Sequence, residues 1–235
     1  MDIIQTLAQE LGKNVQHVEN VVRLLDEGNT IPFIARYRKE LHGTMDDTSL
    51  RTLEERLQYL RGLEERREAV KKSIDEQGKL TDELAAAIDS AKTLAEVEDL
   101  YRPYKQKRRT RATMAKEKGL EPLAALIFAQ ERGCPRPEDA ARDFIAPERG
   151  VESVEDALQG ASDIIAEQIS DDAAIRKSLR ALISRQGQLV SKAATEDDSV
   201  YRLYYDFTQS VARLQGHQVL AINRGEKEGI LKVSI

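Results

Sequence analysis

The sequence predicts a mainly α, elongated multi-helix scaffold with one long strut helix and a small β-containing C-terminal segment. Aromatic residues make up only 5% of the chain and Trp is absent, whereas Ala, Leu, Glu, Arg and Lys are abundant. This composition favours helices over a β-sandwich. Apolar residues recur at helical spacing through most of the chain before Gly187, and the spacing becomes extended after it.

We expect three segments along the chain. Residues 1–78 form an N-terminal, helix-turn-helix-like part that includes a long helix at 46–77. Residues 79–187 form a second helical part that includes a basic segment at 101–119. Residues 188–235 form a mixed α/β segment.

Three short helices with tight turns open the chain. The first, "DIIQTLAQEL", ends at Gly12; Asn14 can cap the second, and Pro32 fits the first turn of the third. This trio fits a helix-turn-helix geometry, which reads DNA in some proteins but in most is only core packing. Both interpretations stay open at this point.

The clearest predicted element is the helix over residues 46–77. Its apolar stripe consists of Leu50, Leu53, Leu57, Leu60, Val70 and Ile74, and charges of both signs cover the other faces. At about 1.5 Å per residue it is nearly 50 Å long, against roughly 45 Å for the diameter of a compact sphere of this chain length. We therefore expect an elongated protein in which this helix acts as a strut.

More helices follow the strut. Thr81 and Thr93 are capping residues for two of them, and Glu96 completes the spacing of a capping box. The apolar stretch "EPLAALIFAQ" is expected in the core. Two apolar stripes predict that residues 153–170 and 171–187 pair as a helical hairpin.

The last segment mixes two patterns. "QLVSKAA" and "GILKVSI" are predicted to be extended, whereas "LYYDFTQSVARL" and "HQVLAINRG" are ambiguous and assigned to helices. The sequence stops at Ile235 within a strand-like pattern. Because a strand needs a partner, we expect the protein to continue past this point.

The sequence offers little material for catalysis. Three histidines, His17, His42 and His217, are scattered, Cys134 is solitary, and no Gly-rich phosphate loop is present. We expect no enzyme activity, no metal and no cofactor. The single cysteine, the lack of a signal-peptide core and the lack of an apolar run of roughly 18 residues predict a cytoplasmic protein without a membrane partner.

A basic run stands out in an otherwise acidic chain. The net charge is −5, yet residues 102–116 contain no Asp or Glu and carry seven cations, Arg102, Lys105, Lys107, Arg108, Arg109, Arg111 and Lys116. Such density favours an anionic partner, and arginine can hold phosphate with two hydrogen bonds. Tyr101 and Tyr104 can stack on bases or pack the start of the run.

Three interpretations of the basic run remain open. It binds nucleic-acid phosphates, it pairs with carboxylates of its own protein or of a neighbouring domain, or it is a solvated loop. The first interpretation depends on cations that are free of the chain's own Asp and Glu. A second, smaller cluster, Arg36, Arg38 and Lys39, can extend the positive surface if the fold brings the two together.

Two long motifs carry a resemblance to a known family. "LLDEGNTIPFIARYRKELHGTMDDTSLRTLEERLQYL" and "DLYRPYKQKRRTRATMAKEKGLEPLA", together with the final "LAINRGEKEGILKVSI", closely resemble the N-terminal region of the Tex family of bacterial transcription accessory proteins. The motif positions are Pro32, Phe33, Ala35, Arg36, Tyr37, Arg38, Lys39, Glu40, Tyr101, Pro103, Tyr104, Lys105, Lys107, Arg108 and Arg109. The resemblance covers essentially the whole chain.

The resemblance implies a cytoplasmic, nucleic-acid-binding protein whose N-terminal region is a helical scaffold. It also implies that residues 188–235 lead into an RNase H-like domain, followed by helix-hairpin-helix motifs and an OB-fold RNA-binding domain. Tex-like proteins are similar to a eukaryotic transcription elongation factor with histone-chaperone activity. The family has no firmly assigned catalytic residues in this region.

The leading hypothesis is a non-enzymatic module that binds RNA or DNA without sequence specificity in transcription or RNA metabolism. The candidate contacts are Arg102, Lys105, Lys107, Arg108, Arg109, Arg111, Arg36, Arg38 and Lys39. The rival is an interaction scaffold, in which the same cations clamp downstream domains, RNA polymerase or the ribosome. A third option is sequence-specific DNA reading by residues 1–45, which equal affinity for unrelated duplexes excludes.

Overall fold

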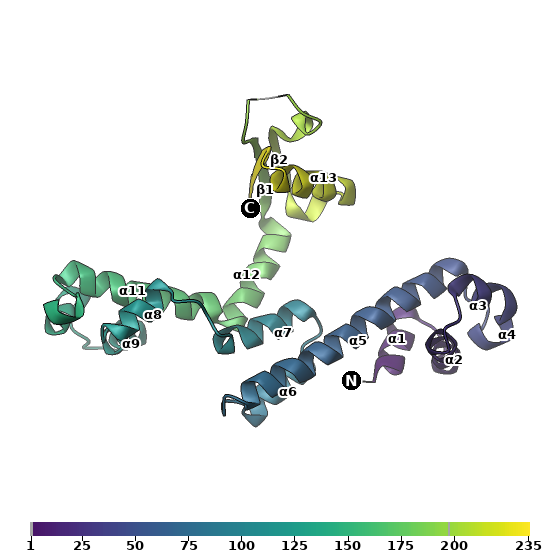
Figure 1. Cartoon of the computed structure of the whole chain (residues 1–235), viewed down its shortest axis with the longest axis horizontal. Helices are drawn as coiled ribbons and strands as arrows, with labels where there is room; N and C mark the ends of the chain where they lie inside the picture. Colours follow the sequence, from purple (N-terminus) through teal and green to yellow (C-terminus); the bar gives the residue numbers. More distant parts are fainter. Residues whose placement is uncertain (1, 197) are drawn as a thin grey trace. The chain divides into compact units, whose positions relative to one another are not determined.

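The computed structural model of the chain describes residues 2–196 and 198–235 (Figure 1). Their contacts divide the chain into two compact units, residues 1–105 and 106–235. The division lies inside the basic run. The three-segment division expected from the sequence stays a prediction.

The first unit is helical. Its elements are α1 (Ile3–Leu11), α2 (Val15–Asp26), α3 (Ile31–Tyr37), α4 (Lys39–His42), α5 (Asp47–Asp75), α6 (Asp82–Ser90), α7 (Leu94–Tyr101) and the 3₁₀ turn η1 (Arg102–Tyr104). Helices α1, α2 and α3 pack on α5, as do α6 and α7 farther along it (Figure 1). The long helix predicted over 46–77 is confirmed, and its predicted apolar stripe is buried in a core shared by these helices.

Local side-chain caps fix where the helices of this unit begin. The Asp46 carboxylate accepts a hydrogen bond of 2.8 Å from the Ser49 N–H at the start of α5. The Thr93 hydroxyl accepts one from the Glu96 N–H at 3.2 Å. The Glu96 carboxylate in turn accepts from the Lys92 N–H at 2.7 Å, so the expected capping box closes one residue early.

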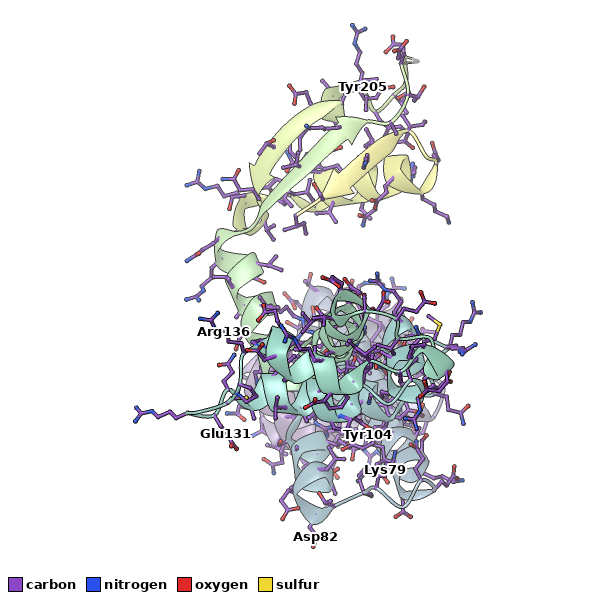
Figure 2. The ribbon with its side chains drawn as sticks, turned by 90° about the vertical axis from the view of Figure 1, so that its left-hand side faces the viewer. Lys79, Asp82, Tyr104, Glu131, Arg136 and Tyr205 are labelled. Carbon is purple, nitrogen blue, oxygen red and sulfur yellow. The ribbon has the colours of Figure 1, made fainter. Side chains whose placement is uncertain are left out.

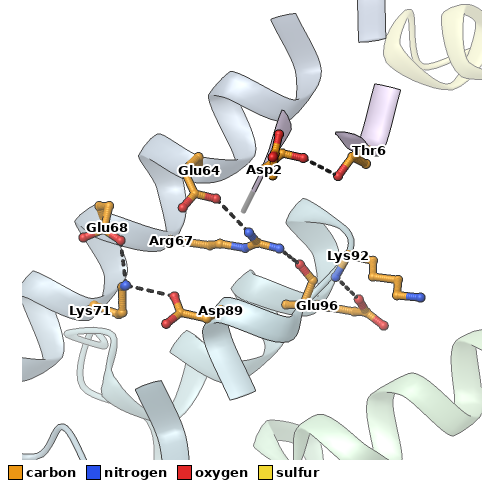
Figure 3. A network of polar contacts seen from close by, with 10 residues as sticks. Asp2, Thr6, Glu64, Arg67, Glu68, Lys71, Asp89, Lys92 and Glu96 are labelled. Atoms are coloured by element: carbon orange, nitrogen blue, oxygen red, sulfur yellow. Dashed lines mark hydrogen bonds and ion pairs between the residues drawn. The ribbon is translucent and has the colours of Figure 1, made fainter. Parts of the chain in front are cut away.

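A buried arginine interrupts the apolar stripe of α5. The Arg67 side chain is 3% exposed, and its guanidinium donates to the Glu64 carboxylate at 2.7 Å and to the Ala91 carbonyl (Figure 3). One turn further, the Lys71 amino group lies 2.8 Å from Asp89 and 2.6 Å from Glu68 (Figure 3). These contacts tie α5 to α6 and to the loop before α7.

The second unit combines helices with a small sheet. Its elements are α8 (Arg111–Glu117), α9 (Glu121–Ala129), α10 (Pro137–Ala141), η2 (Arg142–Phe144), η3 (Pro147–Arg149), α11 (Val154–Asp171), α12 (Ala173–Gln186), β1 (Gln188–Ala193), η4 (Arg202–Tyr204), β2 (Asp206–Ser210), η5 (Val211–Arg213), α13 (Gly216–Lys227) and β3 (Leu231–Ser234). The mainly α fold class with a small C-terminal β segment is thus confirmed. None of the described helices is long and apolar enough to cross a membrane.

Helix α11 is the centre of the helical core of this unit. It packs on α8, α9 and α10, and a Cβ atom at Gly160 would lie 2.3 Å from Cδ1 of Leu120. The expected hairpin of α11 and α12 is wrong, because the small residues of α11 bury their face against α8 and α9, and α12 has no buried residue. The stretch expected in the core is buried only at Leu123 and Ala124, whereas Phe128 on α9 is 53% exposed.

Three antiparallel strands in the order β2-β1-β3 form the sheet, and α13 packs against β3 (Figures 1 and 2). The register pairs Val190 with Thr208 and Ser191 with Val233. The helix assigned to "LYYDFTQSVARL" is wrong, because residues 206–210 form β2. Pairing with β1 satisfies the backbone groups of this segment, whereas its own periodicity is weak.

Candidate nucleic-acid interface

The predicted site residues are divided between the two units. Arg36, Arg38, Lys39, Arg102 and Lys105 belong to the first unit. Lys107, Arg108, Arg109 and Arg111 belong to the second. The basic run therefore joins the two units, and each half is anchored to the unit in which it lies.

Two tyrosines anchor the start of the run to the first core. The Tyr101 hydroxyl lies 2.9 Å from the Ser73 hydroxyl on α5, and the Tyr104 carbonyl accepts a 3.0 Å hydrogen bond from the Gln77 side chain. Both rings pack against the core of the first unit. Of the two roles that the sequence left open for these tyrosines, packing is the one that this geometry supports.

Lys105 is neutralised within the first unit. Its amino group pairs with the Glu98 carboxylate and lies 5.4 Å from the centroid of the Tyr101 ring. Arg66 on α5 donates to the same carboxylate at 2.6 Å. These hydrogen bonds lower the pKa of Glu98 from its ordinary value. The bond from Arg66 has the larger effect, and the bond from Lys105 has the smaller one. Arg102, at the start of η1, is exposed.

Lys107 is the most enclosed cation of the run. Its amino group pairs with Asp171 and lies 3.4 Å from a carboxylate oxygen of Glu167, both on α11. The three side chains are 28%, 13% and 24% exposed, respectively. The Thr110 hydroxyl adds a 3.1 Å hydrogen bond to Glu167, so this carboxylate pair ties the run to α11.

The middle of the run is open to solvent. Arg109 lies 2.6 Å from Glu117, and Arg111 lies 3.8 Å from Asp163, with the two arginine side chains 67% and 80% exposed. Arg108 is exposed, and no ion pair of it is found in the part of the chain that the structure describes. Exposed pairs of this kind contribute about 0–1 kcal/mol, so a phosphate can displace them at little cost.

The second cluster lies on α3 and α4. The Arg38 guanidinium lies 5.1 Å from the centroid of the Phe33 ring and donates to the Tyr37 carbonyl at 3.1 Å. The Tyr37 ring, 5.3 Å from that of Phe33, is 58% exposed. Arg36 and Lys39 are exposed, and neither forms an ion pair within residues 2–196 and 198–235.

The expectation that the run is free of the chain's own carboxylates is wrong for most of its cations. Within residues 2–196 and 198–235, Asp or Glu carboxylates pair with at least these cations: Lys105, Lys107, Arg109, Arg111 and Lys116. The pairing separates them into two kinds, because Lys107 is partly enclosed whereas Arg109 and Arg111 remain exposed. Nucleic-acid binding by the predicted residues stays a prediction.

Family models match both ends of the chain. Residues 1–75 match the model described as the Tex-like protein N-terminal domain, and residues 134–235 match the model described as Tex central region-like. The chain belongs to the Tex family. The resemblance found in the two long motifs is thereby confirmed.

Relatives of this Tex-family chain include a protein of Bacillus subtilis (strain 168) called uncharacterized protein YdcI, 48% identical over 98% of the chain and 32% of the relative. The transcriptional accessory protein Tex of Neisseria gonorrhoeae is 43% identical over 100% of the chain and 31% of the relative. The human S1 RNA-binding domain-containing protein 1 is 31% identical over 100% of the chain and 24% of the relative. The chain thus spans about a third or less of the length of these relatives.

Sequence reasoning missed the acidic partners of the Tex basic run. Glu167 and Asp171 lie about 60 residues beyond Lys107, so no local pattern joins them. One signal was present: the two carboxylates are four residues apart, which places them on one face of a helix. Nothing in the sequence indicates which cation that face meets.

Proposed function

We propose that this Tex-family chain is a non-catalytic, cytoplasmic helical module that contributes to nucleic-acid binding in transcription or RNA metabolism. The names of two relatives support the proposal, since one is called a transcriptional accessory protein and another contains an S1 RNA-binding domain. The chemistry is that of phosphate recognition by exposed arginines and lysines, which needs no base-specific contacts.

The observation that carries the proposal is the exposure of Arg108, Arg109 and Arg111 in a segment fixed at both ends. Lys107 and Thr110 lie on either side of Arg108 and Arg109, and both are held to carboxylates of α11. Arg111 follows directly as the first residue of α8, so the arginines are presented on anchored backbone. The ion pairs of Arg109 and Arg111 are weak, because both arginine side chains are largely exposed. At Arg109 and Arg111 a phosphate replaces the paired carboxylate, and the polyanion releases condensed counterions, which favours binding at low salt.

The α3–α4 cluster supports the same function. Arg36 and Lys39 supply two further exposed cations, and Tyr37 presents a ring on which an unpaired base can stack. Arg38 supports this ring indirectly, because it is held between the Phe33 ring and the Tyr37 carbonyl. In this proposal Arg38 positions the aromatic pair, whereas Arg36 and Lys39 contact phosphate.

The second candidate function is an interaction scaffold. It is favoured by the pairing of Lys105 and Lys107 with carboxylates of this chain, which shows that part of the run already serves packing. A scaffold role predicts that removing the exposed arginines lowers the thermal stability of the full-length protein and leaves its affinity for nucleic acid unchanged.

The test measures the salt dependence of binding to a labelled DNA duplex and to a labelled single-stranded RNA. The variant replaces Arg108, Arg109 and Arg111 by Gln. Its matched control replaces three other exposed arginines of the second unit, Arg132, Arg136 and Arg213, by Gln, so that both proteins lose the same net charge (Figure 2 labels Arg136).

Each lost phosphate contact flattens the slope of log affinity against log salt by about 0.9 on duplex DNA and about 0.7 on a single strand. We therefore expect a flattening of up to about 3 for the run variant, and a smaller one for the control. No detectable binding by the parent chain at low salt overturns the proposal, as do equal slopes for the two variants.

A further inference from the structure

Helix α11 carries three acids in a row that meet the basic run. Asp163, Glu167 and Asp171 lie four residues apart, which spreads them over about 12 Å along one face of the helix. The cations that they face, Lys107 and Arg111, belong to the same unit of the chain as α11. We call these three residues the acidic face of α11.

Cations of the run occupy this face along its length. The Nε atom of Arg111 lies 3.8 Å from Oδ1 of Asp163 at one end. The amino group of Lys107 lies 3.4 Å from Oε1 of Glu167 in the middle and pairs with Asp171 at the other end. The run thus already makes, with its own protein, the kind of contact that it would make with a bound polyanion.

The acids of this contact are fixed more firmly than the arginine that they hold. The Asp163 side chain is 16% exposed, and its Oδ1 accepts a 3.2 Å hydrogen bond from the Gln159 amide one turn earlier on α11. Glu167 accepts a 3.1 Å hydrogen bond from the Thr110 hydroxyl. Because the Arg111 side chain is 80% exposed, it is the partner that can turn towards another anion while Asp163 stays in place.

We propose that the acidic face of α11 is an autoinhibitory contact, which competes with nucleic acid for Arg111 and Lys107. The inference rests on the proposed function, since it concerns the regulation of that same site. A phosphate that binds Arg111 must replace Asp163, so the strength of this ion pair is subtracted from the affinity for nucleic acid. The basic run therefore binds more weakly than its charge allows.

A purely anchoring role of the acidic face makes the opposite prediction, because loss of its charge would then loosen the run and lower the affinity. Thr110 favours competition at Arg111, since its hydroxyl caps α8 by accepting a 3.0 Å hydrogen bond from the Thr113 N–H. This cap fixes the backbone of Arg111, the first residue of α8, without the ion pair to Asp163. Removal of the Asp163 charge thus frees the arginine side chain and leaves its backbone in place.

Binding to a labelled single-stranded RNA and a labelled DNA duplex tests the inference, with Asp163→Asn alone and together with Glu167→Gln. The two amides keep acceptor oxygens for Gln159 and Thr110 and remove only the charge. At low salt we expect binding that is about 2- to 5-fold tighter for the single variant and about 4- to 20-fold tighter for the double variant, as the strength of exposed and partly buried ion pairs implies. The gain should shrink as the salt concentration rises.

Glu131→Gln with Glu148→Gln is the matched control for the double variant. It removes the same charge from two exposed glutamates of the second unit that form no ion pair within residues 2–196 and 198–235. It should raise the affinity by less than about 2-fold. An equal gain for the double variant and the control overturns the inference, as does an affinity that the double variant lowers or leaves unchanged.

A double-mutant cycle assigns the effect to one ion pair. In a chain that carries Arg111→Gln, the gain from Asp163→Asn should fall below about 1.5-fold, because the arginine that it frees is absent. An equal gain with and without Arg111→Gln overturns competition for this arginine.

The same measurements separate a failure of the inference from a failure of the proposed function. Binding by the parent chain that weakens with Arg111→Gln supports the proposed function, and an unchanged affinity of Asp163→Asn then overturns the autoinhibition alone. No binding at low salt by the parent chain or by any of the variants overturns both.

Discussion

Lys107→Gln should destabilise the second unit, although it removes a cation from a run proposed to bind polyanions. The side chain is enclosed against α11 and faces two carboxylates, those of Asp171 and Glu167. The substitution removes both ion pairs and leaves the two acids four residues apart on one helix face, where they repel each other. A partly buried ion pair contributes more to folding stability than an exposed one. We therefore expect the substitution to lower the stability of the second unit by about 1–2 kcal/mol.

Local hydrogen exchange of α11 is the assay for this loss. A change of about 1–2 kcal/mol corresponds to exchange that is roughly 5- to 30-fold faster. Peptides from α1 to α5, in the other unit, provide an internal reference in the same sample. Global unfolding is less suitable, because a chain with two units need not unfold in one step.

Arg108→Gln is the matched control, since its side chain is exposed and has no ion pair in the described part of the chain. It should change the free energy of local opening of α11, as measured by hydrogen exchange, by less than about 0.5 kcal/mol. If Lys107→Gln leaves α11 unchanged, or if Arg108→Gln has the same effect, the division of the run into a structural cation and exposed cations is refuted.

Three other substitutions or conditions test the packing. Arg67→Ala should destabilise the first unit by about 2–5 kcal/mol, measured by hydrogen exchange of α5, because it empties a buried position and leaves the Ala91 carbonyl without its donor; a loss below about 1 kcal/mol would contradict this. Gly160→Ala should cost about 1–3 kcal/mol in the second unit, since its Cβ would lie 2.3 Å from Leu120, and wild-type stability would show that the contact relaxes freely. The lowered pKa of Glu98 means that its ion pairs stabilise the folded state above about pH 4.5, and that this contribution, at most about 1 kcal/mol for a partly exposed group, is lost as the pH falls through the folded pKa. Glu98→Gln should therefore flatten the acid limb of a stability profile of the first unit, and an unchanged limb would show that the pairs contribute nothing.

Much of the fold could be predicted from the sequence, because helix caps and apolar spacing depend on residues that are close together in the chain. Asn14, Thr81 and Thr93 cap the helices that they were expected to cap, because a hydroxyl or amide oxygen reaches an N–H only two or three positions ahead. The apolar stripe of α5 was readable for the same reason, since its spacing is a property of one helix. The basic run was also found by composition within a single segment.

The arrangement of these pieces depended on contacts between distant segments. Residues 206–210 became a strand because β1 supplied a partner for their backbone, which no local pattern specifies. The apolar stripes of α11 and α12 looked alike in sequence, yet only α11 carries the small residues that let α8 and α9 approach.

The electrostatic state of the basic run was likewise a tertiary result. The sequence determined that seven cations lie between residues 102 and 116, within an acidic chain. Only the fold decided that Lys105 meets Glu98 and that Lys107 meets Asp171, whereas Arg108 stays exposed. The reason is that charge count is additive along a chain, whereas neutralisation depends on distance in space, which only packing sets.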